Sequence, residues 1–384
     1  MLCNVCKNPI PNTIYESDSS LTSLCLVYEK EKTKIRYCEC CTHLQTDTIG
    51  SLETYYDQEY EILTNSEEED QIYEVKEGKP IFRTDHQINV LLEKIEFNKE
   101  SRVLDYGCAK SSMMKVLTGY IPGFKPSLFD VSDRYLDYWE KFCNPENYAV
   151  YELPKHWSES FEVVTSFFSL EHIENPANTL AKIFELLEPG GCLYAIVPNV
   201  ITNKADFLVS DHVNHFTESS LRYLLTQAGF KVREIDAQSH NGALIIIAER
   251  QLSDEKLPWT PSESVRHELQ VLMMETASYW KDMALEIRNF ENSLEANNNI
   301  AIYGAGFYGS FIKCCLSDSG RINCLIDQNP YLQGRSIQGI QVIPPDNLDS
   351  EIDTVMVGLN PVKAKSIIGA IDSFSKRNLN YFFL

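Results

Sequence analysis

Apolar and polar positions change their period along the chain in a regular way. From about residue 100, apolar runs such as RVLDYGC, PSLFDVSD and FEVVTSFFSLEHI alternate with stretches whose apolar residues lie three and four apart. Continuous apolar runs are typical of strands buried on both faces, and the wider spacing is typical of amphipathic helices. The alternation predicts an α/β fold with an open, largely parallel sheet and helices on both faces.

A second block of this kind begins near residue 299. The strand NIAIYGAG is followed by a helix and by the strand INCLIDQNP, and the runs GIQVIP, TVMVGL and NYFFL predict further strands. Residues 251–298, between the two blocks, carry apolar residues at helical steps and predict a helical bridge. We therefore expect a central sheet domain over 71–250 and a C-terminal Rossmann-like α/β domain over 299–384.

The first 70 residues lack this alternation and are rich in cysteine. CNVC and RYCECC contain cysteines three positions apart, a spacing from which two thiolates of one turn reach a tetrahedral zinc ion. We predict a zinc-binding domain followed by an acidic, tyrosine-rich connector, because so short a segment could hardly bury a core unaided. Cys40 could compete with Cys38, and plain buried thiols are the alternative. The predicted ligands of a structural zinc are Cys3, Cys6, Cys38 and Cys41.

The composition of the chain limits the classes of partner that we expect it to bind. The 384 residues include 55 acidic and 34 basic side chains, a net charge of −21, and no basic cluster that would attract nucleic acid. No apolar run approaches the roughly 20 residues that span a membrane. The N-terminus does not resemble a secretory signal, so we expect a cytoplasmic protein whose twelve cysteines are reduced or bind metal.

The first sheet contains a pattern typical of nucleotide binding. Asp105 and Gly107 end one predicted strand and Asp130 ends the next, where a tight turn approaches the ligand and a carboxylate can bind ribose hydroxyls. A plain turn aspartate is the alternative for Asp130. An ideal D-x-G-x-G-x-G would have glycine where this chain has Ala109 and Ser111, and small residues at these positions still permit close approach.

With VLDYGC, LFDVSD, VVTSFFSLEHI and LLEPGG together, residues 100–250 resemble the class I S-adenosylmethionine-dependent methyltransferases. The whole chain is similar to the three-domain sugar C-methyltransferases, which have an N-terminal zinc domain and a C-terminal Rossmann-like domain beginning near YGA. The resemblance implies S-adenosylmethionine as donor, a nucleotide-linked sugar as acceptor, and a place in glycan or specialised-sugar biosynthesis. The predicted donor-site residues are Asp105, Gly107, Ala109, Asp130, Ser169 and His172.

The resemblance also implies a catalytic base. In PNVITNKADFLVSDHVNHF, His212 occupies the family's histidine position and Asp211 its acidic position, whereas Val209 replaces a family tyrosine. Tyr73 matches a second family tyrosine. A histidine suits removal of a proton from a carbon next to a ketone or from a hydroxyl, because its pKa lies near neutrality. Alternatively, His212 is a loop residue that hydrogen-bonds to backbone.

Other polar residues near the same edge remain open in role. His215 precedes Thr217, a natural helix N-cap with Ser220 at the third position, and either lines the acceptor pocket or is structural. Tyr73, Asn199 and Asn214 are candidate donors of a hydrogen bond to the developing negative charge. A zinc site at Asp211, His212 and His215 would lack a fourth ligand. His172 either lines the pocket or caps a helix.

The C-terminal block carries G-x-G-x-x-G between a strand and a helix, with Asp327 after the next strand, as in a dinucleotide-binding fingerprint. The resemblance implies instead that this domain helps to hold the acceptor, through Gly304, Gly306 and Tyr308. An empty structural turn is a third interpretation. Methyl transfer to oxygen or nitrogen of another acceptor, or an NAD- or nucleotide-binding protein without methyl transfer, are the alternative functions.

Overall fold

The computed structural model describes residues 1–28, 31–47, 70–76, 79–251, 259–295 and 298–384. Most of the predicted acidic connector, over 48–69, lies outside the described residues. The chain divides into two compact units. The first comprises Met1–Thr13, Ile35–Phe207 and His212–Val271, and the second comprises Ile14–Lys34, Leu208–Asp211 and Leu272–Leu384.

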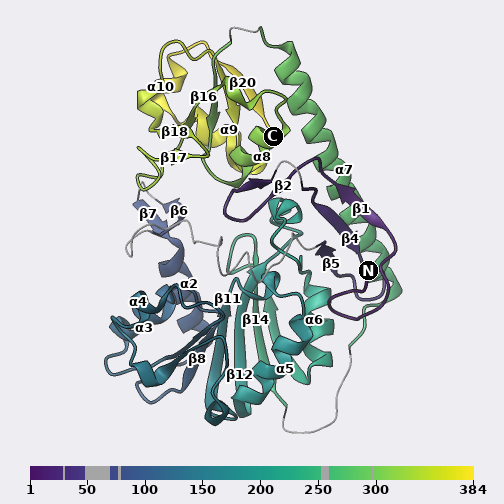
Figure 1. The fold of residues 1–384 in the computed structure, drawn as a ribbon, viewed down its shortest axis with the longest axis vertical. Helices are drawn as coiled ribbons and strands as arrows, with labels where there is room; N and C mark the ends of the chain where they lie inside the picture. The colour runs from purple at the N-terminus through teal and green to yellow at the C-terminus, as the bar shows by residue number, and fades with distance from the viewer. Residues whose placement is uncertain (29–30, 48–69, 77–78, 252–258, 296–297) are drawn as a thin grey trace. The chain divides into compact units, whose positions relative to one another are not determined.

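The first unit is built on a seven-stranded mixed sheet (Figure 1), which confirms the predicted α/β fold. All its strands are parallel except β14, which runs antiparallel to both neighbours. In spatial order the strands are β10 (Tyr148–Val150), β9 (Ser127–Asp130), β8 (Val103–Tyr106), β11 (Phe161–Phe167), β12 (Leu187–Pro198), β14 (Ala243–Arg250) and β13 (Phe230–Asp236).

Alternate residues of each strand enter two separate cores. Leu193, Ala195 and Val197 of β12 pack in one core with apolar residues of two helices, α5 (Pro176–Leu186) and α6 (Glu218–Gln227). Tyr194 and Ile196 pack in the other core with residues of α2, α3 and α4. Because both faces are buried, the strands have the continuous apolar runs seen in the sequence. The three helices of this second core are α2 (Arg83–Lys94), α3 (Ser112–Tyr120) and α4 (Leu136–Trp139).

Two hairpins accompany the sheet. β4 (Lys34–Tyr37) and β5 (Leu44–Thr46) pair in the cysteine-rich N-terminal segment, and β6 (Ile72–Lys76) pairs with β7 (Lys79–Phe82) directly before α2. Two short 3-10 helices follow strands β11 and β12 on the carboxyl edge of the sheet, where a ligand is expected. They are η4 (Leu170–His172) and η5 (Lys204–Leu208). The remaining short turns are η2 (Pro145–Asn147) and η3 (Lys155–Trp157).

The second unit contains a six-stranded sheet that is parallel except for the edge hairpin β17–β18. Its order is β17 (Ser336–Ile337), β18 (Ile340–Ile343), β16 (Ile322–Ile326), β15 (Ile300–Tyr303), β19 (Thr354–Val357) and β20 (Asn380–Phe383). Its helices are α8 (Phe307–Cys315), η6 (Ser319–Arg321), η7 (Pro345–Asn347), α9 (Pro361–Gly369) and α10 (Asp372–Ser375). The long helix α7 (Glu263–Ser293) contributes residues to both units.

Residues 14–34 group with the C-terminal sheet, although they lie within the N-terminal segment of the sequence. They contain most of β1 (Thr13–Glu16) and all of two further short strands, β2 (Ser20–Leu21) and β3 (Val27–Tyr28). Among the described residues, no helix combines the length and the apolar character that crossing a membrane requires.

Candidate active site

The turn from β8 to α3 follows the backbone path of a glycine-rich loop. Gly107 has φ +69°, and Ala109 and Ser111 also lie in the left-handed region, with φ of +45° and +51°. Residues with a Cβ atom seldom adopt this conformation, because the Cβ approaches the following carbonyl oxygen. The two positions at which the chain departs from D-x-G-x-G-x-G therefore keep the conformation that glycine would favour. We call residues 107–111 the donor loop, because the sequence predicts that they bind the methyl donor.

Asp105 lies beneath the donor loop and is fully buried. Its Oδ2 accepts a hydrogen bond from Ser111 Oγ at 2.7 Å, and its Oδ1 accepts one from Thr165 Oγ1 at 3.0 Å. Burial raises the pKa of Asp105 to about 6, although the two hydroxyl donors oppose the shift. The carboxylate thus fixes the loop to strand β11 and changes charge just below neutral pH.

Asp130, at the end of β9, holds the other side of the donor loop. Its Oδ2 accepts from the backbone N–H of Ala109 at 2.8 Å, and its Oδ1 accepts from that of Ser132 at 3.1 Å. The backbone N–H of Gly107 donates to Phe129 O at 2.8 Å. Each carboxylate oxygen has two lone-pair positions, so this carboxylate keeps capacity to accept from ribose hydroxyls. This geometry fits a nucleoside such as that of S-adenosylmethionine.

Ser169, which precedes η4, lies directly against Gly107. A Cβ atom added to Gly107 would lie 2.2 Å from Ser169 Oγ, so only glycine leaves room here for a close approach. His172 ends the same short helix and is half-buried. The predicted donor-site residues from β8, β9 and η4 therefore gather at the carboxyl edge of one sheet.

Four side chains form a buried hydrogen-bonded row beside this edge. Asp206, from η5, has Oδ1 at 2.6 Å from Nδ1 of His212 and Oδ2 at 3.1 Å from Nδ1 of His215. His215 Nε2 lies 2.6 Å from Thr46 Oγ1. Burial would raise the pKa of Asp206, but hydrogen bonds and charge from the two histidines more than offset it and hold that pKa below its usual range. Asp206 is therefore ionised and directs Nδ1–H of each ring toward itself.

No sequence pattern singles out Asp206. The family resemblance implies Asp211, the immediate neighbour of His212, as the orienting acid, whereas the carboxylate at 2.6 Å from His212 is that of Asp206. Asp211 accepts hydrogen bonds from the backbone N–H and the Oγ of Ser23, at 2.7 and 2.6 Å. An acid six residues before the histidine carries no periodic signature in a loop, so only the folded chain identifies it.

Glu171 and His172 approach His212 from η4. One carboxylate oxygen of Glu171 and one ring nitrogen of each histidine lie within 4.8 Å of one another. The rings of His172 and His212 meet edge to face, with centroids 4.7 Å apart. Glu171 is buried, and burial raises its pKa to about 8 against the opposing charge of His212. Two carboxyl groups with opposite pKa shifts therefore flank His212.

Tyr73 and Asn199 lie at other points of the same unit. The Tyr73 ring stacks on His86 with centroids 3.8 Å apart, and its hydroxyl accepts from the backbone N–H of Asn241 at 2.8 Å. Asn199 follows β12, and its backbone N–H donates to Gly242 O at 2.9 Å. Because Asn241 and Gly242 are consecutive, one turn contacts both Tyr73 and Asn199, two of the candidate donors to the negative charge.

Residues 82–235, which include the donor loop and the two histidines, match the family model described as a methyltransferase domain. The protein is an S-adenosylmethionine-dependent methyltransferase. A demethylmenaquinone methyltransferase from Chlorobaculum parvum is 24% identical over 41% of this chain and 77% of its own length. A ubiquinone biosynthesis O-methyltransferase from Aromatoleum aromaticum is 28% identical over 42% of this chain and 78% of its own length.

A third relative, from Mycolicibacterium smegmatis, is described as "Probable S-adenosylmethionine-dependent methyltransferase". It is 30% identical over 26% of this chain and 44% of its own length. The three similarities cover less than half of this chain, so they identify the methyltransferase without naming its acceptor.

The N-terminal segment of the methyltransferase brings four thiols together. Cys3 Sγ lies 3.5 Å from Cys41 Sγ, Cys6 Sγ lies 3.4 Å from Cys38 Sγ, and all four sulfurs lie within 4.8 Å of one another. Zinc–sulfur bonds of about 2.3 Å place tetrahedral ligands roughly 3.8 Å apart, so this set could bind a zinc ion. Cys38, rather than Cys40, completes the group.

The cysteine turn contacts the loop that carries the histidines. Asn4, between Cys3 and Cys6, donates from Nδ2 to Asn214 Oδ1 at 3.0 Å. Asn214 Nδ2 in turn donates to Leu170 O at 3.1 Å and to Ile173 O at 2.7 Å, across the turn that holds Glu171 and His172. The N-terminal segment therefore holds the candidate site edge of its own unit through this asparagine pair as well as through Thr46 and His215.

In the second unit, the predicted fingerprint forms a tight turn between β15 and α8. Gly304 has φ +101°, and the backbone N–H of Ala305 donates to Asp327 Oδ2 at 2.9 Å. Gly306 has open space at its Cβ position, and Tyr308 is half-buried, with its pKa raised to about 12 by burial. An acceptor role for Gly304, Gly306 and Tyr308 remains a prediction.

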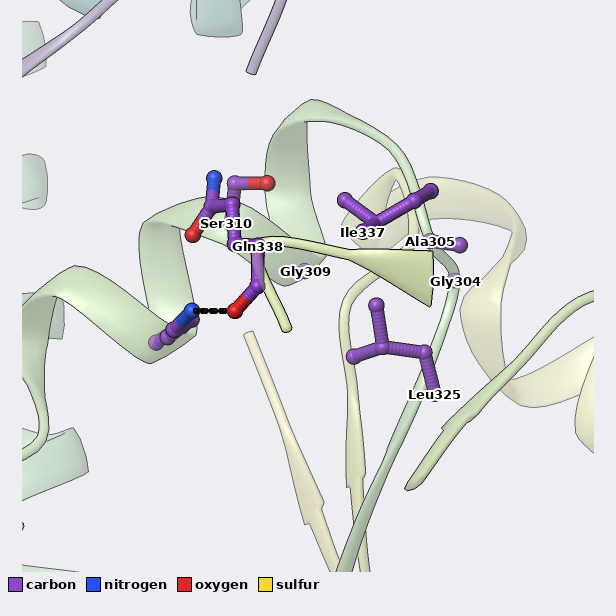
Figure 2. Close-up of a pocket in the computed structure, with 8 residues that line it drawn as sticks. Gly304, Ala305, Gly309, Ser310, Leu325, Ile337 and Gln338 are labelled. Carbon is purple, nitrogen blue, oxygen red and sulfur yellow. Dashed lines mark hydrogen bonds between the residues drawn. The ribbon is translucent and has the colours of Figure 1, made fainter. Parts of the chain in front are cut away.

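A cavity of about 10 Å³ lies at this turn, which is room for about one water molecule. Figure 2 shows Ile337, which ends strand β17, and the following Gln338 near the glycine turn. Lys313 Nζ donates to Gln338 O at 3.3 Å. The residues at the turn of the hairpin β17–β18 therefore line this small cavity together with the glycine turn.

Proposed function

We propose that this methyltransferase acts on a nucleotide-linked sugar and that His212 is the base that removes the acceptor proton. The observation that carries the proposal is the 2.6 Å contact between His212 Nδ1 and the ionised Asp206. A carboxylate on Nδ1 fixes the tautomer, leaves Nε2 to accept a proton, and stabilises the imidazolium that forms. The sugar acceptor rests on the similarity of the three-part chain to the sugar C-methyltransferases.

The residues present fit S-adenosylmethionine, which when bound supplies a methyl group activated by a sulfonium. Donor binding is assigned to the backbone of the donor loop and the carboxylate of Asp130, with Asp105 holding the loop. Ser169 and His172 complete the predicted donor site. Methyl transfer is an in-line displacement, so the protein contributes mainly the relative placement of the reactants.

Tyr73 and Asn199 are proposed to donate hydrogen bonds to the oxygen on which negative charge develops. His215, fully buried with both ring nitrogens hydrogen-bonded, is proposed to position Asp206. Asp211 would act as a further acid beside the base, as the family resemblance implies.

Transfer to oxygen is a second candidate, because one relative is named as an O-methyltransferase. The same base would then remove a hydroxyl proton in place of one from carbon. Incubation with a panel of nucleotide-linked keto- and deoxysugars, followed by NMR of the product, distinguishes a new C–CH₃ from a new O–CH₃ group. A panel in which no sugar is methylated, while a non-sugar acceptor is, would contradict the sugar assignment.

His212→Gln tests the base. We expect its turnover to fall by about 100-fold or more, the usual range for loss of a general base, with donor affinity within twofold of the unchanged protein. His156→Gln, at an exposed position of the same unit, is the matched control and should retain full activity. A fully active His212→Gln would remove this residue from the mechanism.

Calorimetric titration separates the classes of function. S-adenosylmethionine and its demethylated product should each bind with one equivalent per chain. A donor-loop variant should lose the binding of both ligands together. NAD is the third titrant. Binding of NAD alone would contradict assignment of the donor loop to a methyl donor.

Zinc is proposed to be structural, because four thiolates leave no open position for chemistry. The double variant Cys38→Ser, Cys41→Ser should lose its zinc, measured by metal analysis of the purified chain. Cys40→Ser, which changes the exposed thiol between them, should keep a full equivalent. Undiminished zinc in the double variant would contradict the ligand set.

A further inference from the structure

Glu171 is a buried carboxyl group with an unused oxygen. Its side chain follows β11 on the carboxyl edge of the sheet, and the residue is 1% exposed. Within the described residues, Oε2 has no hydrogen-bond partner. An ionised carboxylate without partners is costly to bury, so such a group is either protonated or serves a charge that appears during the reaction.

The charged and titratable groups around Glu171 come from several elements. His212 and His172 lie within 4.8 Å, as described above. Asp206 of η5 lies behind His212, and Arg83 of α2 also acts on the Glu171 charge. Asn214 donates its backbone N–H to Glu171 O at 2.9 Å and holds the backbone of η4 in place. The carboxyl group is therefore fixed beside the proposed base.

We propose that Glu171 is a positioning residue that exchanges a proton with His212, so that the base gains a second carboxylate partner when it becomes charged. This role of Glu171 rests on the proposed function, in which His212 is the base. It assigns the two flanking carboxyl groups different tasks: Asp206 is ionised throughout, and Glu171 changes charge with the imidazole.

The proton movements balance. In the resting site Glu171 is protonated and His212 is neutral, with Nδ1–H directed to Asp206. When the acceptor C–H or O–H bond breaks, its electron pair stays on the acceptor and an N–H bond forms on His212. Glu171 then loses its proton to solvent by way of the half-buried His172. After methylation the imidazolium returns one proton to Glu171, so one proton leaves the acceptor and one reaches solvent.

Burial and charge at Glu171 and the enclosure of His212 support this exchange. Burial raises the pKa of Glu171 to about 8, so it carries a proton at neutral pH, and the charge of His212 opposes that shift. Each group therefore favours the charged form of the other, which is the condition for a coupled pair. His212 is only 8% exposed and its Nδ1 contacts Asp206, so a neighbouring acid offers its proton a way out.

NMR titration of the histidine ring protons tests the coupling in the zinc-loaded full chain, with His212→Gln used to assign the His212 signal. In the unchanged protein we expect His212 to titrate in two steps. In Glu171→Gln it should titrate in one step, with an apparent pKa lower by about one unit. Glu174→Gln, an exposed acid three residues further along, is the matched control and should keep both steps.

Turnover gives the second measurement. Glu171→Gln should lower kcat by about tenfold with donor affinity and KM within twofold, whereas a purely structural role would change stability and leave the two-step titration. A single His212 step in the unchanged protein would overturn the proposal without any variant, even if Glu171→Gln fails to fold.

Two further outcomes have distinct meanings. A fully active His212→Gln would contradict the proposed function. If His212→Gln is inactive but His212 of the unchanged protein titrates in a single step, only the role of Glu171 is contradicted. Titration of the chain with added zinc gives a further test. A second tight equivalent that is lost in Glu171→Gln would show that the same three groups bind metal, and a metal-bound His212 could not exchange a proton.

Discussion

The two glycine turns of this chain have the same pattern of hydrogen bonds but differ in the groups that their glycines contact. In the donor loop, Gly107 donates to Phe129 O and the following Asp130 accepts from Ala109. In the C-terminal turn, Gly304 donates to Ile326 O at 2.7 Å, and the following Asp327 accepts in the same way from the loop. Asp327 Oδ1 also accepts from the backbone N–H two residues further on, as Asp130 does.

The surroundings of the glycines separate the two turns. The missing Cβ of Gly107 leaves room beside a side chain, Ser169. A Cβ at Gly304 would instead lie 2.3 Å from Gly358 O, and one at Gly309 would lie 1.9 Å from Gly304 O. The C-terminal glycines therefore allow backbone segments to pack against one another, whereas Gly107 allows the side chain of Ser169 to lie against the turn.

A strand, a glycine turn and an acid after the next strand therefore form one stable unit of backbone structure. The acid satisfies the N–H groups of the turn in both cases, with no ligand involved. The fingerprint therefore predicts the turn, and the groups in front of it decide whether anything binds there.

Gly309→Ala against Gly306→Ala gives the largest expected effect. The added methyl group at Gly309 meets backbone, which cannot move aside, so we expect a loss of about 3 kcal/mol in the free energy of unfolding. Gly306 has no atom within 4 Å of its Cβ position, so its alanine variant should change stability by less than about 0.5 kcal/mol. Urea unfolding of the full chain measures both. Equal stability of the two variants would contradict the packing role of the C-terminal glycines.

The next largest effects on stability are expected from Asp130→Asn and Asp327→Asn. Asparagine keeps one acceptor oxygen of the two, so each variant leaves one backbone N–H of its turn without its acceptor. We expect each to lose roughly 2 kcal/mol of stability. Only Asp130→Asn should also weaken S-adenosylmethionine binding, by at least about tenfold, as measured by calorimetry. Equal weakening in Asp327→Asn would show that the C-terminal turn takes part in donor binding.

The sequence allowed the fold to be predicted because both sheets depend on apolar periodicity. It also predicted the cap of α6, where Thr217 and Ser220 form a reciprocal capping box, since that pattern is local. Asp206 escaped prediction because the loop between η5 and His212 has no periodicity, so no local pattern indicates that the acid six positions earlier contacts the His212 ring. The contact of Gly304 with Gly358 joins segments far apart in sequence, and no local pattern records it.

Donor binding should depend on pH through Asp105, whose counterpart before the C-terminal turn is the apolar Ile302. Burial raises the pKa of Asp105 to about 6, so the folded chain holds a proton there that the unfolded chain has lost. Its contribution to stability therefore falls as pH rises from about 4 to 6. The cationic donor favours the ionised form, so its affinity should rise about tenfold between pH 5 and 7.5.

Calorimetry at the two pH values measures this dependence, and Asp105→Asn is the control. The variant should show one affinity at both values, because the amide does not titrate. A pH dependence that survives in Asp105→Asn would assign the titration to another group, such as Asp130, whose pKa burial also raises.

The smallest expected effect reverses sign between the two turns. Ala109 and Ala305 each donate their backbone N–H to the acid of their own turn, but Ala109 has φ +45° and Ala305 has a negative φ. Glycine relieves the left-handed strain at position 109, so Ala109→Gly should stabilise the chain by about 0.5 kcal/mol. Ala305→Gly should destabilise it by about the same amount, because there glycine only adds freedom to the unfolded chain. Urea unfolding of the two variants side by side decides the matter: a loss of stability in both would mean that the donor loop is unstrained and that its departures from glycine carry no cost.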